Sequence, residues 1–272
     1  MADIGASLHN AIEVYKKNWQ KMLFAAFLVY IPIIVAYTIE IAFLFSIGYN
    51  FSEEFSTETL FSEYAYFMVS ILVMILAAYF VYMFLNLGYL RYLNLYFTKE
   101  PKLGEILHFL KYRKLDTILF FIIFGIVISL ILSPLIIEIL LSRLESVASI
   151  AFMFFLLIVC CLAMILFSFS HVAFSIENLG PDAAIKRSFN LVKENYFTTI
   201  LFFIIYTILI LIADIILLLV AFLLMLTIIL IPLSFIIFIL ILLFNVSFGK
   251  LWMISFYKEM AKSQPQRARI KR

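Results

Sequence analysis

The stretch TILFFII occurs twice in this chain, at residues 117–123 and again at residues 199–205. Each copy opens a long apolar run that follows a short segment containing lysine and arginine. Because about 20 apolar residues are enough for a helix to cross the hydrocarbon core of a bilayer, both copies predict the start of a membrane span. The repetition also suggests that the chain contains repeated units.

The composition excludes a water-soluble fold. Hydrophobic residues make up 66% of the chain and charged residues 14%, whereas soluble domains are about half apolar and a quarter charged. The apolar runs show no strand-like alternation, so the spans are expected to be helices. The N-terminal segment before the first apolar run is polar and amphipathic, which argues against a secretory signal peptide, and we expect the first span to stay in the mature protein.

The pattern predicts an all-α integral membrane protein, a single membrane domain over residues 1–272. Residues 197–248 hold only one charge, Asp214, and are too many for a single span. We divide this run into two spans at the segment ILIPLS, because Pro232 disfavours a continuous helix there. The six transmembrane helices, arranged as three helical hairpins, are expected at residues 22–47, 64–90, 117–141, 147–176, 198–228 and 232–257.

The distribution of basic residues predicts the orientation. With these spans, 19 of the 20 lysines and arginines fall on one side of the membrane, and only Arg143 falls on the other. The positive-inside rule therefore places both termini in the cytoplasm of a cell whose plasma membrane the chain crosses. Residues 259–272 form a basic cytoplasmic tail, which topology and anionic lipid explain more simply than nucleic-acid binding.

The first, third and fifth spans, which run outward from the cytoplasm and are called outgoing, are each preceded by an amphipathic segment. Before the third span, Leu103, Ile106, Leu107 and Leu110 recur at helical spacing. Such a segment is either an interfacial helix in the headgroup layer or an ordinary charged connection between spans. The first interpretation makes anionic headgroups at the cytoplasmic face the partners, with these basic contacts: Lys16, Lys17, Lys111, Arg113, Lys114, Lys186, Arg187 and Lys193.

The two copies of TILFFII extend into a longer correspondence. The shift that superimposes them also pairs Leu103 with Ile185 and Gly88 with Ser170, and Gly249 follows Ser170 at nearly the same interval. A small residue therefore recurs near the inner end of each returning span. These matches predict an internal threefold repeat of amphipathic helix, outgoing span and returning span, over residues 1–98, 99–180 and 181–258.

The text NLGPDAAIKRSFNLVKENYFTTILFFII, residues 178–205, resembles the membrane-domain family associated with glycerophosphoryl diester phosphodiesterases and related uncharacterised prokaryotic membrane proteins. The segment LGYLRYLNLYFTKEPKLGEIL resembles the region before the third span in the same group. In the fused relatives, hydrolysis belongs to a separate soluble domain, so the resemblance implies a multi-span module without that activity. The residues that carry it are Pro181, Ala183, Ala184, Lys186, Arg187, Ser188, Phe189, Asn195 and Tyr196.

Local catalytic and metal-binding motifs are missing from the sequence. The three histidines lie in different segments, and no sequence-local metal site, Walker loop, nucleophile elbow or dinucleotide fingerprint is present. Cys160 and Cys161 are adjacent in one apolar run, where a disulfide between them is not expected. We therefore predict no cofactor, no metal and no enzymatic activity.

Ionisable residues inside the spans are the remaining candidates. Glu40, Glu138 and Asp214 each come from an outgoing span, and they could converge on the repeat axis as a proton or cation site. Alternatively, the two glutamates reach the outer interface and Asp214 bonds a neighbouring helix. The full set of possible intramembrane polar residues adds His171, Asn86 and Asn245.

These observations favour a non-enzymatic membrane module, a scaffold or accessory in envelope or lipid-related processes. The alternative is a small-solute or ion transporter or channel with its path near the repeat axis. A membrane-embedded enzyme comes third, since it would need a carboxylate–histidine constellation that only tertiary structure could assemble.

Overall fold

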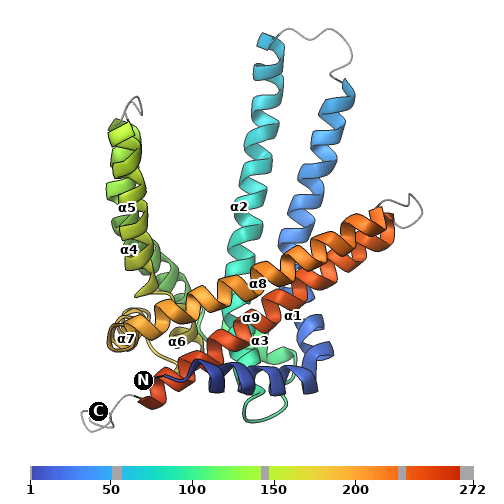
Figure 1. Ribbon diagram of the computed structural model, residues 1–272. Helices are drawn as coiled ribbons and strands as arrows, with labels where there is room; N and C mark the ends of the chain where they lie inside the picture. The colour runs from blue at the N-terminus through green and yellow to red at the C-terminus, as the bar shows by residue number, and fades with distance from the viewer. Residues whose placement is uncertain (1, 51–56, 142–146, 226–230, 264–272) are drawn as a thin grey trace.

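The computed structural model describes residues 2–50, 57–141, 147–225 and 231–263, and within them the chain is helical with no strand. The all-α prediction is therefore confirmed for this part of the chain. In chain order (Figure 1), the helices are α1 (Ile4–Asn50), α2 (Thr57–Leu95), α3 (Gly104–Tyr112), α4 (Lys114–Leu141), α5 (Val147–Ile165), α6 (Ser170–Ile176), α7 (Pro181–Glu194), α8 (Tyr196–Met225) and α9 (Ile231–Ser263).

The long helices pack in pairs. Helices α1 and α2, α4 and α5, and α8 and α9 contact each other, and Figure 1 shows the three pairs diverging from a common base that contains α3, α6 and α7. The predicted division of the last apolar run is confirmed, because α8 ends at Met225 and α9 begins at Ile231. Pro232 lies in the first turn of α9, where a missing N–H costs no helical hydrogen bond.

Within the described residues, five segments are long and apolar enough to cross a membrane. This confirms a membrane protein at the level of length and composition. The sixth predicted span, 232–257, belongs to α9, but many side chains in its first half lie outside the described residues. The five segments are Ile4–Glu40, Leu72–Leu95, Lys114–Ile139, Ile150–Ile176 and Tyr196–Val220.

The fourth predicted span, 147–176, is not one continuous helix. Helix α5 ends at Ile165 and α6 begins at Ser170, with a turn between them. The hydroxyl of Ser188 in α7 donates a hydrogen bond to the carbonyl of Leu166 at 3.1 Å and accepts one from the N–H of Phe169 at 3.2 Å. A side chain from another helix thus replaces helical hydrogen bonds, which is why local sequence did not reveal the break.

The segments before the outgoing spans differ from one another. Helix α1 is continuous from Ile4, and its first part crosses the base at a steep angle to the rest (Figure 1). Helices α3 and α7 are separate and short. Ile106 in α3 and Ile185 in α7 are buried against protein, whereas Leu107 in α3 is 64% exposed. Part of each predicted apolar stripe therefore packs on the protein core, and placement in the headgroup layer stays a prediction.

The core lies at the base, where α2, α6 and α9 come together. Tyr89 in α2 and Trp252 in α9 are fully buried. The ring centroid of Phe169, just before α6, lies 6.0 Å from that of Phe256 in α9. A Cβ atom on Gly88 would lie 2.5 Å from the carbonyl oxygen of Ile106. The small residue at this position is thus required by the close approach of α3.

Candidate functional site

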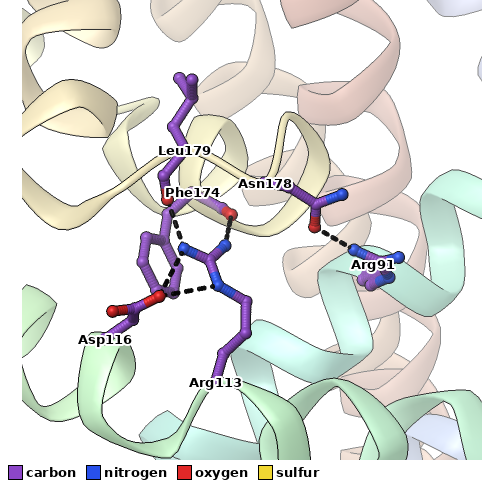
Figure 2. A network of polar contacts seen from close by, with 6 residues as sticks. All are labelled: Arg91, Arg113, Asp116, Phe174, Asn178 and Leu179. Atoms are coloured by element: carbon purple, nitrogen blue, oxygen red, sulfur yellow. Dashed lines mark hydrogen bonds and ion pairs between the residues drawn. The ribbon is translucent and has the colours of Figure 1, made fainter.

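The link between α6 and α7, residues 177–180, is the polar centre of the base. Asn178 adopts a φ of 53°, the left-handed conformation that asparagine tolerates better than most residues. Arg91 of α2 donates a hydrogen bond to the Oδ1 atom of Asn178, and Figure 2 shows this contact beside the one made by Arg113. The link is therefore connected to α2 and to the start of the second hairpin.

Arg113 joins α3 and α4 to this link (Figure 2). Its guanidinium group donates to the carbonyl oxygen of Phe174 at 3.1 Å, donates to the carbonyl oxygen of Leu179, and pairs with Asp116 at 3.2 Å. It also lies 4.3 Å from the centroid of the Phe174 ring. Only the planar fork of an arginine can satisfy two carbonyl groups and a carboxylate together while it stacks on a ring.

Glu177 connects the same link to the third hairpin. The Oη atom of Tyr257 in α9 donates to its carboxylate at 2.7 Å, and Arg187 in α7 pairs with it at 3.3 Å. Arg113 and Arg187, which the sequence predicts as lipid-headgroup contacts, bind protein groups here, and their contact with lipid stays a prediction. Their side chains are only 13% and 26% exposed because each binds protein acceptors instead.

Lys250 in α9 forms a second polar site. Its Nζ atom donates a hydrogen bond to Oδ1 of Asn86 in α2 and lies 3.4 Å from the hydroxyl of Tyr30 in α1. Three tyrosine rings surround it, those of Tyr30, Tyr82 and Tyr89, with centroids 5.1, 5.6 and 5.2 Å away. No acidic side chain among the described residues forms an ion pair with it.

This tyrosine-caged lysine holds three helices together. Aromatic faces attract an ammonium group, and each contact contributes about 0.5–2 kcal/mol depending on how dry the site is. The hydroxyls of Tyr30 and Tyr82 also share a hydrogen bond of 2.7 Å. A sequence signal was available, because Lys250 lies between the apolar segments ILLFNVSF and LWMISFY, but nothing in it indicated that tyrosines of α1 and α2 would be the partners.

The three predicted carboxylates come from three different helices. Glu40, Glu138 and Asp214 belong to α1, α4 and α8, and among the described residues the hydrogen bond of Asp214 goes to Asn245 and not to either glutamate. In the described ranges, no three histidine, cysteine or acidic side chains gather as a possible metal site. The hypothesis of a shared proton or cation site on the repeat axis therefore gains no support from geometry.

The other predicted polar residues have individual partners. Asn245 in α9 donates a hydrogen bond of 2.5 Å to Asp214, which is the bond to a neighbouring helix that the alternative interpretation predicted. The ring of His171 packs 4.5 Å from that of Phe124 and 5.2 Å from that of Phe120. Asn86 is the predicted residue that belongs to the Lys250 site.

The remaining predicted headgroup contacts are on the surface. Lys186 pairs with Asp182 at 3.7 Å and Lys193 lies 5.9 Å from the centre of the Phe189 ring. Cys160 and Cys161 are both free thiols. All six lysines predicted as headgroup contacts are exposed: Lys16, Lys17, Lys111, Lys114, Lys186 and Lys193.

Comparison with known proteins identifies no relative, since no family model, no curated protein and no solved structure matches this chain. The resemblance to the phosphodiesterase-associated membrane domain stays a prediction. The two polar sites and the arrangement of the helices are therefore the observations that bear on function.

Proposed function

We propose that this chain is a non-enzymatic integral membrane module that acts as a scaffold or accessory in an envelope or lipid-related process. One observation carries the proposal. Charged side chains at the base, such as Arg113 and Glu177, bind other protein groups, while the hairpins diverge above them. Such a site fixes the relative positions of helices, because its charged groups are bound to other groups of the same protein rather than to a substrate.

The finer architecture belongs to the same proposal: six spans in three hairpins of a plasma membrane, with both termini in the cytoplasm. A threefold repeat is supported by three small residues at similar spacing in the chain: Gly88 in α2, Ser170 at the start of α6 and Gly249 in α9. Ser170 is fully buried. Membership of the phosphodiesterase-associated membrane-domain group would agree with this arrangement.

The test is a topology map combined with a flux assay. We would place single cysteines at Ser52, Ser146, Leu230 and Gln266 in a chain whose two natural cysteines are replaced, and label intact cells with an impermeant maleimide. Six spans predict external labelling at the first three positions and none at Gln266. Any other pattern would contradict the six-span arrangement.

A transporter is the second candidate, because the hydrogen bond between Asn245 and Asp214 places a carboxylate inside an apolar hairpin. Proteoliposomes distinguish the two functions. A scaffold predicts that ion leakage is the same with the original chain and with Asp214→Asn. A protein-dependent flux that Asp214→Asn removes would establish transport instead.

A further inference from the structure

An open groove lies between α2, α3 and α4, with a volume of about 560 Å³. Its apolar wall comes from Phe84, Leu107, Leu110 and Ile118, and two lysines complete it, Lys111 at the end of α3 and Lys114 at the start of α4. The groove therefore combines an apolar surface with two positive charges on one side, which is the pattern that an amphiphile with an anionic head would match.

The groove spans the expected membrane boundary. Phe84 and Ile118 belong to segments long and apolar enough to cross a bilayer, Leu72–Leu95 and Lys114–Ile139. Lys111 precedes the second segment, and Lys114 is its first residue. An acyl chain beside Phe84 and Ile118 would thus lie at hydrocarbon depth while its headgroup lies beside the lysines.

The charges of both lysines are uncompensated. Asp116, the acidic residue in the first turn of α4, pairs with Arg113 at 3.2 Å. Glu105, in the first turn of α3, lies 3.9 Å from Lys99. Neither Lys111 nor Lys114 forms an ion pair within the described part of the chain, and both are exposed. Because the two nearby acids pair with other basic residues, the charges of the two lysines are available to an anion.

We propose that this groove binds one anionic glycerophospholipid, with its phosphate between Lys111 and Lys114 and an acyl chain along Phe84 and Ile118. The inference rests on the proposed function as a membrane module and names the class of lipid that it recognises. A second groove, of about 470 Å³ between α1 and α9, has no charged residue in its lining and serves as an internal comparison. Its lining consists of Trp19, Gln20, Leu23, Phe24, Phe27, Ile239, Leu240 and Leu243.

The test measures lipid binding to the delipidated full chain in detergent by native mass spectrometry. We expect phosphatidylglycerol to bind at one site more tightly than phosphatidylcholine of the same chains. Each lysine near an anionic headgroup is worth about fivefold in affinity, so the Lys111→Gln/Lys114→Gln variant should bind phosphatidylglycerol about 30-fold more weakly. Lys21→Gln/Lys102→Gln, which removes the same charge at two exposed positions outside the groove lining, should bind as the original chain does.

Two further measurements distinguish binding of a lipid from binding of a free phosphate group. Glycerol phosphate, which has the headgroup charge without chains, should not displace the lipid at millimolar concentration. Ile118→Trp, at a position that is 41% exposed, fills the groove and should weaken lipid binding while both lysines remain. Thermal unfolding of every variant shows that a loss of binding is not a loss of folding.

The proposal is overturned if the Lys111→Gln/Lys114→Gln variant binds phosphatidylglycerol as tightly as the original chain, or if phosphatidylcholine binds equally well. Displacement by glycerol phosphate would also overturn it, because it would show an anion site without a chain-binding groove. These failures are distinct from a failure of the proposed function, which the maleimide map and the flux assay report independently of lipid class.

Discussion

Lys250 and Asn86 are 164 residues apart in the chain, yet the Nζ atom of the lysine donates a hydrogen bond to the side-chain oxygen of the asparagine. This bond connects the third hairpin to the first at a place where three tyrosine rings surround the ammonium group and no acid of the described ranges pairs with it. The lysine therefore contributes to the position of α9 against α1 and α2, beside the hydrogen bond from Trp252 to Ser7 and that from Tyr89 to Ser247.

We predict that Lys250→Met and Asn86→Leu are strongly coupled. Hydrogen bonds to charged groups contribute about 1.5–3 kcal/mol, and each single change leaves the other group without its partner. A double-mutant cycle of unfolding in mixed micelles should give a coupling energy of about 1–3 kcal/mol. The control cycle pairs Asn86→Leu with Lys262→Met, whose side chain is 70% exposed and bonded to Glu259. Additive effects in both cycles would show that the Lys250 bond contributes nothing.

We predict that Arg113→Lys destabilises the protein almost as much as Arg113→Gln, by about 2–4 kcal/mol. Lysine keeps the charge but cannot bind the carbonyls of Phe174 and Leu179 and the carboxylate of Asp116 together. Chemical unfolding measures the effect. The neighbouring exposed Lys114→Gln should change stability by less than about 0.5 kcal/mol. Full rescue by lysine would mean that only the charge of Arg113 matters.

We predict that Ser188→Ala opens the break between α5 and α6. The substitution leaves the carbonyl of Leu166 and the N–H of Phe169 without their hydrogen bonds, at a cost of about 1–3 kcal/mol. Hydrogen exchange at Phe169 should become faster. Ser168→Ala is the control, since that hydroxyl bonds only within its own turn, to Ile165. Unchanged exchange at Phe169 would contradict this role of Ser188.

We predict that Tyr206→Phe restores part of the stability lost in Gly249→Ala but none of the stability lost in Gly88→Ala. A Cβ on Gly249 would clash with the hydroxyl of Tyr206, so Tyr206→Phe should recover part of the stability that Gly249→Ala loses. A Cβ on Gly88 would meet the backbone carbonyl of Ile106, which no side-chain change can remove. Melting temperatures of the single and double variants measure both. Gly88→Ala, combined with Tyr206→Phe as the matched control, should show no recovery.

We predict that Lys258 titrates near pH 8. Burial lowers the pKa of this lysine from 10.5 to about 8, although its ammonium group lies 4.0 Å from the centre of the Phe97 ring. The folded protein therefore loses this proton before the unfolded chain does. The destabilising effect of the buried charge is complete below pH 8 and disappears as the pH rises to about 10.5.

NMR of reductively ¹³C-methylated lysines measures this titration directly. The stability difference between Lys258→Met and the original chain should shrink between pH 8 and pH 10.5, with the variant relatively more stable at the lower pH. A titration midpoint near 10.5 would show that the site does not disfavour the charge. A difference in stability that does not change with pH would lead to the same conclusion.

The sequence by itself determined the membrane-spanning helices. Hydropathy along one helix is a local property, and so is the effect of Pro232 on the helix that contains it, which is why the division between α8 and α9 was predicted correctly. The sequence also predicted that Asp214 would bond a neighbouring helix, because a carboxylate in an apolar hairpin requires a polar partner, although it did not identify Asn245 as that partner.

Only the tertiary structure decided which charged groups are at the surface and which are inside. Lys250, Arg113 and Arg187 look in the sequence like ordinary basic residues of a cytoplasmic boundary, and Lys111 and Lys114 look the same. The first three bind acceptors on helices distant in the chain or on the link before α7, whereas the last two remain exposed beside a groove. The physical reason is that a buried charge needs partners, and partners contributed by other helices are fixed only when those helices pack.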